Sequence, residues 1–218
     1  LYTDLKGHTP SKVIELPSSG SNRRYFRLSE ADGSDNVIGV LGTSKEENSA
    51  FIYMSRHFAS KGIPVPEVLA VSDDTMAYLQ TDLGDSLLFG EIEKGRVTRS
   101  FSAHEKELMA LTISRLPDIQ FAGADGLDFS VCYPSVDFDV RSIMWDLNYF
   151  KYCFLKATGL EFSEDKLEDD FQRLTTVLME SSEGNTFMYR DFQSRNVMIR
   201  DNTPWFIDFQ GGRRGPFY

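Results

Sequence analysis

Residues 188–211 read MYRDFQSRNVMIRDNTPWFIDFQG and contain the pattern on which the fold prediction depends. An aspartate, Asp191, is followed five residues later by Asn196 and then by a second aspartate, Asp208. This order and spacing match the catalytic loop and the metal-binding aspartate of enzymes that transfer phosphoryl groups. In such sites one carboxylate accepts the proton of the attacking hydroxyl, while the amide and the other carboxylate bind magnesium. The segment therefore predicts Asp191 as the base, and Asn196 and Asp208 as metal ligands.

Two short apolar runs in the same segment predict a β-hairpin. Val197–Ile199 and Trp205–Ile207 consist of residues that favour strands, and residues 200–204 between them, RDNTP, favour a turn. Antiparallel partners lie about 5 Å apart, so the hairpin would bring Asn196, before its first strand, next to Asp208, after its second. The two predicted metal ligands therefore converge from opposite ends of the hairpin.

The motif departs from that of protein kinases at two positions. Protein kinases have H-R-D and D-F-G at the two aspartates, whereas this chain has Tyr189 in place of the histidine and Gln210 in place of the glycine. Gly211 comes one place late. Taken singly, Asp and Asn are ordinary turn residues. Three of them at fixed offsets around a predicted hairpin favour a catalytic interpretation, and the departures point away from ordinary protein kinases.

Three other segments, together with this one, resemble the aminoglycoside phosphotransferase and choline kinase superfamily, whose fold is similar to that of protein kinases. They are residues 20–27 (GSNRRYFR), 62–69 (GIPVPEVL) and 82–85 (DLGD). Within the superfamily, the RRYFR element and the IDFQ ending resemble the bacterial kinases that phosphorylate N-acetylmuramate and N-acetylglucosamine at the anomeric hydroxyl. The resemblance implies a phosphotransferase that acts on a hydroxyl of a small molecule, with a cell-wall amino sugar as the favoured acceptor.

The same resemblance implies an α+β, two-lobed protein-kinase-like fold with a β-rich small lobe and a mostly helical large lobe. We place the ATP-binding small lobe at residues 1–83 and the catalytic large lobe at residues 84–218. Apolar periodicity predicts strands at Val13–Leu16, Tyr25–Leu28 and Val37–Leu41, and helices at Lys45–Lys61, Ala103–Leu116, Asp139–Ala157 and Leu167–Met179. The family continues through several helices, so we expect a chain truncated at its C-terminus, with a further domain downstream.

Nucleotide-binding residues are expected at two places in the small lobe. Backbone N–H groups of a loop between two strands could cover the phosphates, although a simple hairpin turn explains the same composition; this loop contains Ser19, Gly20, Ser21 and Asn22. The segment Ala77–Thr81 resembles the strand before the hinge between lobes. Main-chain groups of the following residues, Asp82 and Leu83, should hold adenine.

The predicted third strand lacks the lysine that kinases use to bind the α- and β-phosphates and to pair with a helix glutamate. No lysine occurs in Val37–Leu41. Arginines on the preceding strand suit phosphate, and strand alternation with Tyr25 leads us to expect that Arg24 or Arg27 takes this role. A solvated strand face is the competing interpretation. Glu47 is expected to be a first-turn helix acid rather than an ion-pair partner.

The helix predicted at Asp139–Ala157 carries a stripe of aromatic residues. We expect this stripe to belong to the hydrophobic core rather than to a ligand platform; it consists of Trp145, Tyr149, Phe150, Tyr152 and Phe154. Asp146 on the same helix is interpreted as an exposed residue rather than a sugar contact.

The composition argues against several other classes of protein. The net charge of −10 over 218 residues offers no basic footprint for nucleic acid and argues against an anionic membrane surface. Two cysteines without C-x-x-C spacing and three scattered histidines do not indicate a zinc site. No apolar run approaches the ~18 residues of a membrane helix, and no secretory signal is evident. We therefore expect a cytoplasmic protein whose partner is a small molecule.

These observations together predict an enzyme that uses ATP and Mg²⁺. An aminoglycoside or a choline-like amino alcohol is the alternative acceptor. A nucleotide-binding regulatory module or pseudokinase is the alternative class, which the missing strand lysine and Tyr189 favour. Retention of Asp191, Asn196 and Asp208 argues against it.

Overall fold

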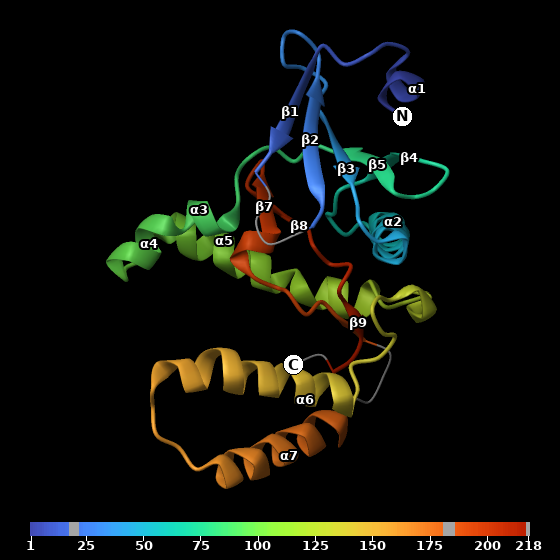
Figure 1. The fold of residues 1–218 in the computed structure, drawn as a ribbon. Coiled ribbons are helices and arrows are strands. Elements are labelled where there is room, and N and C mark those ends of the chain that lie inside the picture. Colours follow the sequence, from blue (N-terminus) through green and yellow to red (C-terminus); the bar gives the residue numbers. More distant parts are fainter. Residues whose placement is uncertain (18–21, 181–185, 217–218) are drawn as a thin grey trace.

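The computed structural model describes residues 1–17, 22–180 and 186–216. Its first part is a five-stranded antiparallel sheet with the strand order β1-β2-β3-β5-β4 (Figure 1). The strands are β1 (Lys12–Leu16), β2 (Arg24–Ser29), β3 (Val37–Leu41), β4 (Val68–Val71) and β5 (Ala77–Thr81). The three strands predicted from runs of strand-favouring apolar residues are thus confirmed, whereas these runs did not predict β4.

One helix, α2 (Lys45–Ser60), packs beside this sheet and begins where it was predicted (Figure 1). The hydroxyl of Ser44 caps its first turn by accepting a hydrogen bond from a backbone N–H at 3.2 Å. The buried face of the helix carries Phe51, Met54 and Phe58. Their spacing of three and four residues places them on one side of the helix. These side chains pack into the same hydrophobic core as buried residues of β3 and β5.

The second part of the chain is mostly helical and lies below the sheet in Figure 1. A short helix, α1 (Tyr2–Lys6), precedes the sheet; the later helices are α3 (Leu88–Glu91), α4 (Glu93–Thr98), α5 (Ala103–Ser114), α6 (Val140–Tyr149) and α7 (Glu164–Glu180). The predicted helix at Asp139–Ala157 is divided into α6, the π-helical η3 (Phe150–Leu155) and the 3₁₀ turn η4 (Lys156–Thr158). The lobe boundary that we place after Leu83 falls between β5 and α3.

Among the described residues, no helix combines the length and the apolar character needed to cross a membrane.

The predicted hairpin is present as β7 (Val197–Arg200) and β8 (Thr203–Phe206). Its second strand begins two residues earlier than predicted, because the turn consists only of Asp201 and Asn202. Both turn residues have positive φ, 51° and 57°, as a two-residue type I′ turn requires. Asp and Asn tolerate this conformation better than most residues. The local turn chemistry therefore sets the hairpin register.

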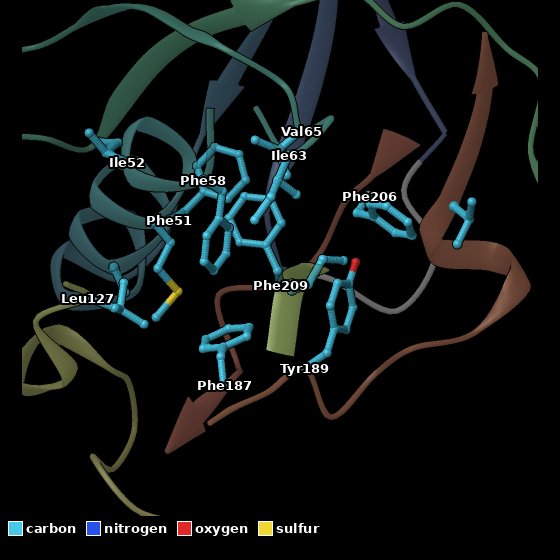
Figure 2. Close-up of a cluster of buried hydrophobic side chains, with 14 of the residues drawn as sticks. Phe51, Ile52, Phe58, Ile63, Val65, Leu127, Phe187, Tyr189, Phe206 and Phe209 are labelled. Carbon is cyan, nitrogen blue, oxygen red and sulfur yellow. The ribbon is translucent and has the colours of Figure 1, made fainter. Parts of the chain in front are cut away.

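An aromatic cluster joins the sheet side of the molecule to the helical side (Figure 2). The ring of Phe209 stacks on that of Phe51 with centroids 5.1 Å apart and meets Phe58 edge-on at 5.3 Å. Phe58 also contacts Phe187, on the short strand β6 (Phe187–Met188), at 5.1 Å. Such aromatic pairs stabilise a core beyond the area they bury. The segment that follows Asp208 is therefore held against α2.

The aromatic stripe of α6 and η3 does not belong to the core, so that prediction was wrong. Trp145 is 73% exposed and Tyr149 is 68% exposed, and the remaining members, Phe150, Tyr152 and Phe154, are exposed as well. The apolar residue that α6 buries is Ile143, and the helix packs against α7. Helical spacing shows that residues share one side of a helix, but which side another element covers depends on tertiary packing.

Candidate active site

Tyr189, at the position of the kinase histidine, anchors the loop that carries Asp191. The side chain is 3% exposed, and its hydroxyl donates to the carbonyl oxygen of Ile207 at 2.5 Å. Burial raises the pKa of the Tyr189 phenol well above its usual value, so the hydroxyl keeps its proton and remains a donor. Ile207 immediately precedes Asp208. This hydrogen bond therefore connects the loop of Asp191 to the predicted metal-binding segment.

Tyr189→Phe is expected to lower the free energy of unfolding by about 1–3 kcal/mol, because it leaves the buried carbonyl of Ile207 without this donor. Denaturant unfolding followed by circular dichroism measures the change. Tyr152→Phe is the matched control, since it removes a hydroxyl from a side chain that is 58% exposed. The control should change the free energy by less than about 0.5 kcal/mol. Equal stability of the two variants would contradict the anchoring role.

The structure brings Asn196 and Asp208 together. Nδ2 of Asn196 donates to the carbonyl oxygen of Asp191 at 3.0 Å and contacts Oδ2 of Asp208 at 3.3 Å. The N–H of Ile207 donates to the carbonyl oxygen of Asn196 at 3.1 Å, which closes the base of the hairpin. Asp208 has a φ of 64°, a conformation that few residues other than glycine adopt. Asp208 thus has a left-handed backbone conformation at the point where its side chain meets Asn196.

Gln210 is a residue of this site that the sequence analysis missed. It is 6% exposed, and its Nε2 donates to Oδ1 of Asp208 at 2.7 Å. The same nitrogen lies 3.4 Å from Oε1 of Glu47 on α2. That oxygen also forms an ion pair with a guanidinium nitrogen of Arg23 at 3.0 Å. Glu47 therefore connects α2 to Arg23 and to Gln210. The expectation that Glu47 is a first-turn acid without an ion-pair partner was wrong.

The carboxyl group of Asp191 has a raised pKa. The main cause is its reduced hydration in the cleft, and the negative charge of Asp208 adds to the effect. The positive charges of Arg190 and Arg213 act in the opposite direction. A carboxylate of raised pKa accepts a proton more readily, which suits the role of a general base.

The oxygen donors of the site fit Mg²⁺. Within the part of the chain that the structure describes, no cluster of three or more His, Cys, Asp or Glu residues could hold a metal. Mg²⁺ does not need such a cluster, because it commonly takes one or two carboxylates and completes its shell with phosphate oxygens and water. Asp208 and the amide of Asn196 offer this kind of partial, oxygen-based set at the edge of a cavity.

A cavity of about 360 Å³ reaches Asn196 and Asp208 from between the sheet and the hairpin. Apolar side chains from both parts of the molecule line it, namely Leu16, Ile38, Leu83, Met198 and Ile207. Polar groups of Asp82, Asn196 and Asp208 also face it. An apolar slot of this size with a few polar groups at its ends suits a heteroaromatic ligand that carries charged substituents.

Arg27 and Asp82, both predicted to bind nucleotide, are paired with each other beside this cavity. Two guanidinium nitrogens of Arg27 bond the two carboxylate oxygens of Asp82 at 2.6 Å and 3.1 Å. A third nitrogen lies 2.9 Å from Oδ1 of Asp85. Bidentate pairs of this type fix geometry as well as charge. Arg27 therefore braces the segment after β5, and two carboxylates already neutralise its charge.

Arg24 lies on the opposite side of the sheet from the cavity. Its side chain is 58% exposed and pairs with Glu15 of β1 at 2.8 Å. Adjacent strand residues point to opposite faces, so the residue that shares the cavity face with Tyr25 is Arg23. Arg24, which we expected to bind phosphate, therefore does not line this cavity. Of the predicted phosphate loop, Asn22 lines a neighbouring cavity, while Ser19, Gly20 and Ser21 lie outside the described residues.

Asp191 borders two further cavities. The first, of about 390 Å³, is also lined by Arg23, Asp208 and Gly211. The second, of about 470 Å³, includes Arg190, which bonds both carboxylate oxygens of Asp146 on α6 at 2.8 Å and 2.7 Å. Asp146 is therefore part of the wall of this space rather than an isolated surface residue. Asp191, the predicted base, thus lines both of these cavities. A base must border a space of this kind in order to contact an acceptor molecule.

Comparison with known proteins finds similar kinases in bacteria. The chain is 27% identical over 212 residues to an N-acetylmuramate/N-acetylglucosamine kinase of Pseudomonas aeruginosa, covering 95% of this chain and 57% of that protein. It is 26% identical over 214 residues to the protein of the same name from Neisseria meningitidis, covering 95% of this chain and 60% of the relative. The chain therefore spans less than two thirds of the length of these relatives.

Solved structures confirm the protein-kinase-like α+β fold. A thermostable mutant of aminoglycoside phosphotransferase APH(4)-Ia, in a ternary complex with AMP-PNP and hygromycin B, superposes with a TM-score of 0.61 at 15% identity. That match covers 99% of this chain and 71% of the other. Choline kinase from Cryptosporidium parvum gives a TM-score of 0.60 at 12% identity, over 94% of this chain and 59% of the other.

A family model provides the decisive assignment, because it matches nearly the whole chain. The model describes the phosphotransferase enzyme family, and the match extends over residues 12–218. It includes the five-stranded sheet, the segment after β5 and the three residues Asp191, Asn196 and Asp208. This chain therefore belongs to the phosphotransferase enzyme family.

Proposed function

We propose that the protein transfers the γ-phosphoryl group of ATP, with Mg²⁺, to a hydroxyl of a small molecule, and that the acceptor is a cell-wall amino sugar. The observation that carries the proposal is the contact of Asn196 with both Asp191 and Asp208 at the edge of the cavity between the sheet and the hairpin. The names of the relatives from Pseudomonas aeruginosa and Neisseria meningitidis support the choice of acceptor. At 26–27% identity they indicate the substrate class rather than establish it.

In the proposed mechanism Asp191 acts as the general base. The acceptor oxygen forms a bond to the γ-phosphorus, its proton moves to the carboxylate of Asp191, and the bond from the γ-phosphorus to the bridging oxygen breaks to release ADP. The raised pKa of Asp191 suits this proton transfer. Phosphoryl transfer depends mainly on positioning and on charge neutralisation, so the protein needs few other reactive groups.

Asp208 and Asn196 would hold the metal in this mechanism. Bound Mg²⁺ neutralises charge on the phosphate oxygens. Gln210 keeps Oδ1 of Asp208 oriented through its 2.7 Å hydrogen bond, and Asn196 contacts Oδ2. Residues 1–83 would contribute the nucleotide site and residues 84–218 the acceptor site, with the apolar slot near Leu83 receiving adenine.

Measurement of ADP release with Mg²⁺ across a panel of acceptors tests the proposal. The panel contains N-acetylmuramate, N-acetylglucosamine, their non-acetylated analogues, choline and an aminoglycoside. We expect turnover that is selective for an N-acetylated sugar and that depends on Asp191. Selective turnover of choline or the aminoglycoside would keep the reaction type but overturn the acceptor class.

A nucleotide-binding module without transferase activity is the second candidate, and the specific observation in its favour is the absence of lysine from β3. The panel also addresses this candidate. Mg²⁺-dependent binding of ATP without turnover of any acceptor would support it. Asp191-dependent turnover of one acceptor would exclude it.

A further inference from the structure

We infer that Arg23, which lies one residue before β2, binds the α- and β-phosphates of the nucleotide in place of the missing strand lysine, and that Glu47 of α2 holds it there. This inference rests on the proposed function and names a phosphate-binding residue for the same site. It replaces the expectation that Arg24 or Arg27 takes this role, because Arg24 pairs with Glu15 on the exposed side and Arg27 pairs with Asp82.

Arg23 is a buried cation at the junction of two cavities. Its side chain is 4% exposed, and it lines both the apolar slot and the neighbouring cavity that contains Asp191 and Asp208. A guanidinium nitrogen lies 3.0 Å from Oε1 of Glu47, and the group stands 5.8 Å from the ring centre of Phe51. A ligand that extended from the slot toward Asp208 would pass this charge. Anionic phosphate is the ligand group that a guanidinium at such a position recognises best.

The sheet explains why an arginine of this segment can take over the role of a lysine on β3. Tyr25 of β2 lies opposite Val40 of β3, and Val40 lies opposite Tyr78 of β5, so these residues form one row across the sheet. Arg23 is two residues before Tyr25 and therefore lies on the same face. Val40 itself is 1% exposed and apolar. The positive charge on the cleft face of the sheet thus comes from Arg23, before β2, rather than from a lysine on β3. The arginine side chain is longer than that of lysine.

Glu47 links this cation to the predicted metal-binding aspartate. Its Oε1 contacts Arg23 at 3.0 Å and Nε2 of Gln210 at 3.4 Å. Gln210 in turn donates to Oδ1 of Asp208 at 2.7 Å. A buried charge is costly unless it is paired, and Glu47 supplies this pairing for Arg23. The glycine of the D-F-G motif has no side chain with which to make such a link.

Calorimetric titration with two probes tests the inference: ADP with Mg²⁺, which carries the α- and β-phosphates, and adenosine, which carries neither. Arg23→Met should weaken ADP binding by about tenfold or more and leave adenosine binding within about twofold. Arg24→Met is the matched control, because it removes a neighbouring arginine from the exposed face. The control should bind both probes as the parent does.

The two probes separate phosphate binding from structural damage. Equal ADP affinity of the Arg23→Met and Arg24→Met variants would overturn the inference, as would equal weakening of ADP and adenosine by Arg23→Met. If Arg23→Met fails to fold, Arg23→Lys and Glu47→Gln carry the test. Both should weaken ADP but not adenosine, by about threefold to tenfold, since the charge at residue 23 remains but its geometry is altered. Unchanged ADP affinity in both would also overturn the inference.

Failure of the proposed function gives a different result. A parent protein that binds neither ADP with Mg²⁺ nor adenosine refutes the nucleotide site itself. A parent that binds ADP but turns over no acceptor of the panel refutes the transferase function, and the affinities of the variants for ADP and adenosine then still decide the assignment of Arg23. If the parent binds ADP and turns over an acceptor, but the Arg23 and Glu47 variants lack the predicted effect, the proposed function stands and the assignment of Arg23 is wrong.

Discussion

Asp191→Asn is expected to lower turnover by about a hundredfold to ten-thousandfold and to leave the affinity for ATP within about twofold. The amide that replaces the carboxylate has a similar shape, so it can remain beside the acceptor, but it cannot accept the proton of the hydroxyl. The main-chain carbonyl of Asp191, which accepts from Nδ2 of Asn196 at 3.0 Å, is unaffected by the change. The position of Asn196 should therefore be preserved.

Steady-state turnover with the best acceptor of the panel, together with calorimetric titration of ATP, measures both parts of this prediction. Asp201→Asn is the matched control. It makes the same chemical change in the hairpin turn, where the side chain is 92% exposed and where φ is positive, which Asn tolerates. The control should retain parental turnover. Comparable turnover in Asp191→Asn and Asp201→Asn would remove Asp191 from the mechanism.

Asp208→Asn is expected to abolish the gain in ADP affinity that Mg²⁺ provides, and to lower turnover at least as strongly as the change at Asp191. Loss of the carboxylate charge weakens the proposed metal site, because Mg²⁺ prefers anionic oxygen ligands. Asn is preferable to Ala at this position for two reasons. The φ of 64° strains most other residues, and Ala would leave the donors Asn196 and Gln210 without the oxygens that they contact.

Titration of ADP at several Mg²⁺ concentrations measures this second effect. In the parent protein, affinity should rise with Mg²⁺, whereas in Asp208→Asn it should remain at the metal-free value. Asp191→Asn serves as the comparison, since it should retain the Mg²⁺ dependence while it lacks turnover. A Mg²⁺ dependence in Asp208→Asn equal to that of the parent would show that another group holds the metal.

The local elements of the fold were predictable because short-range chemistry determines them. A short continuous apolar run identified β3 at its observed bounds, and the periodicity after Ser44 identified α2. The two apolar runs on either side of residues 200–204 identified the hairpin and thereby the approach of Asn196 to Asp208. In each case the determining residues are neighbours in the chain.

The errors concern contacts between residues that are far apart in the chain. The aromatic stripe with Trp145 was expected to be buried, but the sequence pattern does not state which side of α6 another element covers. The contact of Gln210 with Glu47 joins residues that are 163 positions apart. No local pattern could indicate it, although the glutamine in place of the D-F-G glycine marked the position as unusual.

The strand β3, the helix α2, the hairpin and the candidate site residues Asp191, Asn196 and Asp208 could be predicted from the sequence, because each follows from local conformational preference or motif spacing. Three other features became visible only in the packed structure: Arg23 rather than Arg24 faces the cleft, Glu47 and Gln210 connect Arg23 to Asp208, and Arg27 pairs with Asp82 after β5. The physical reason is that ion pairs and buried hydrogen bonds depend on which distant groups the packed core brings within about 3 Å of each other.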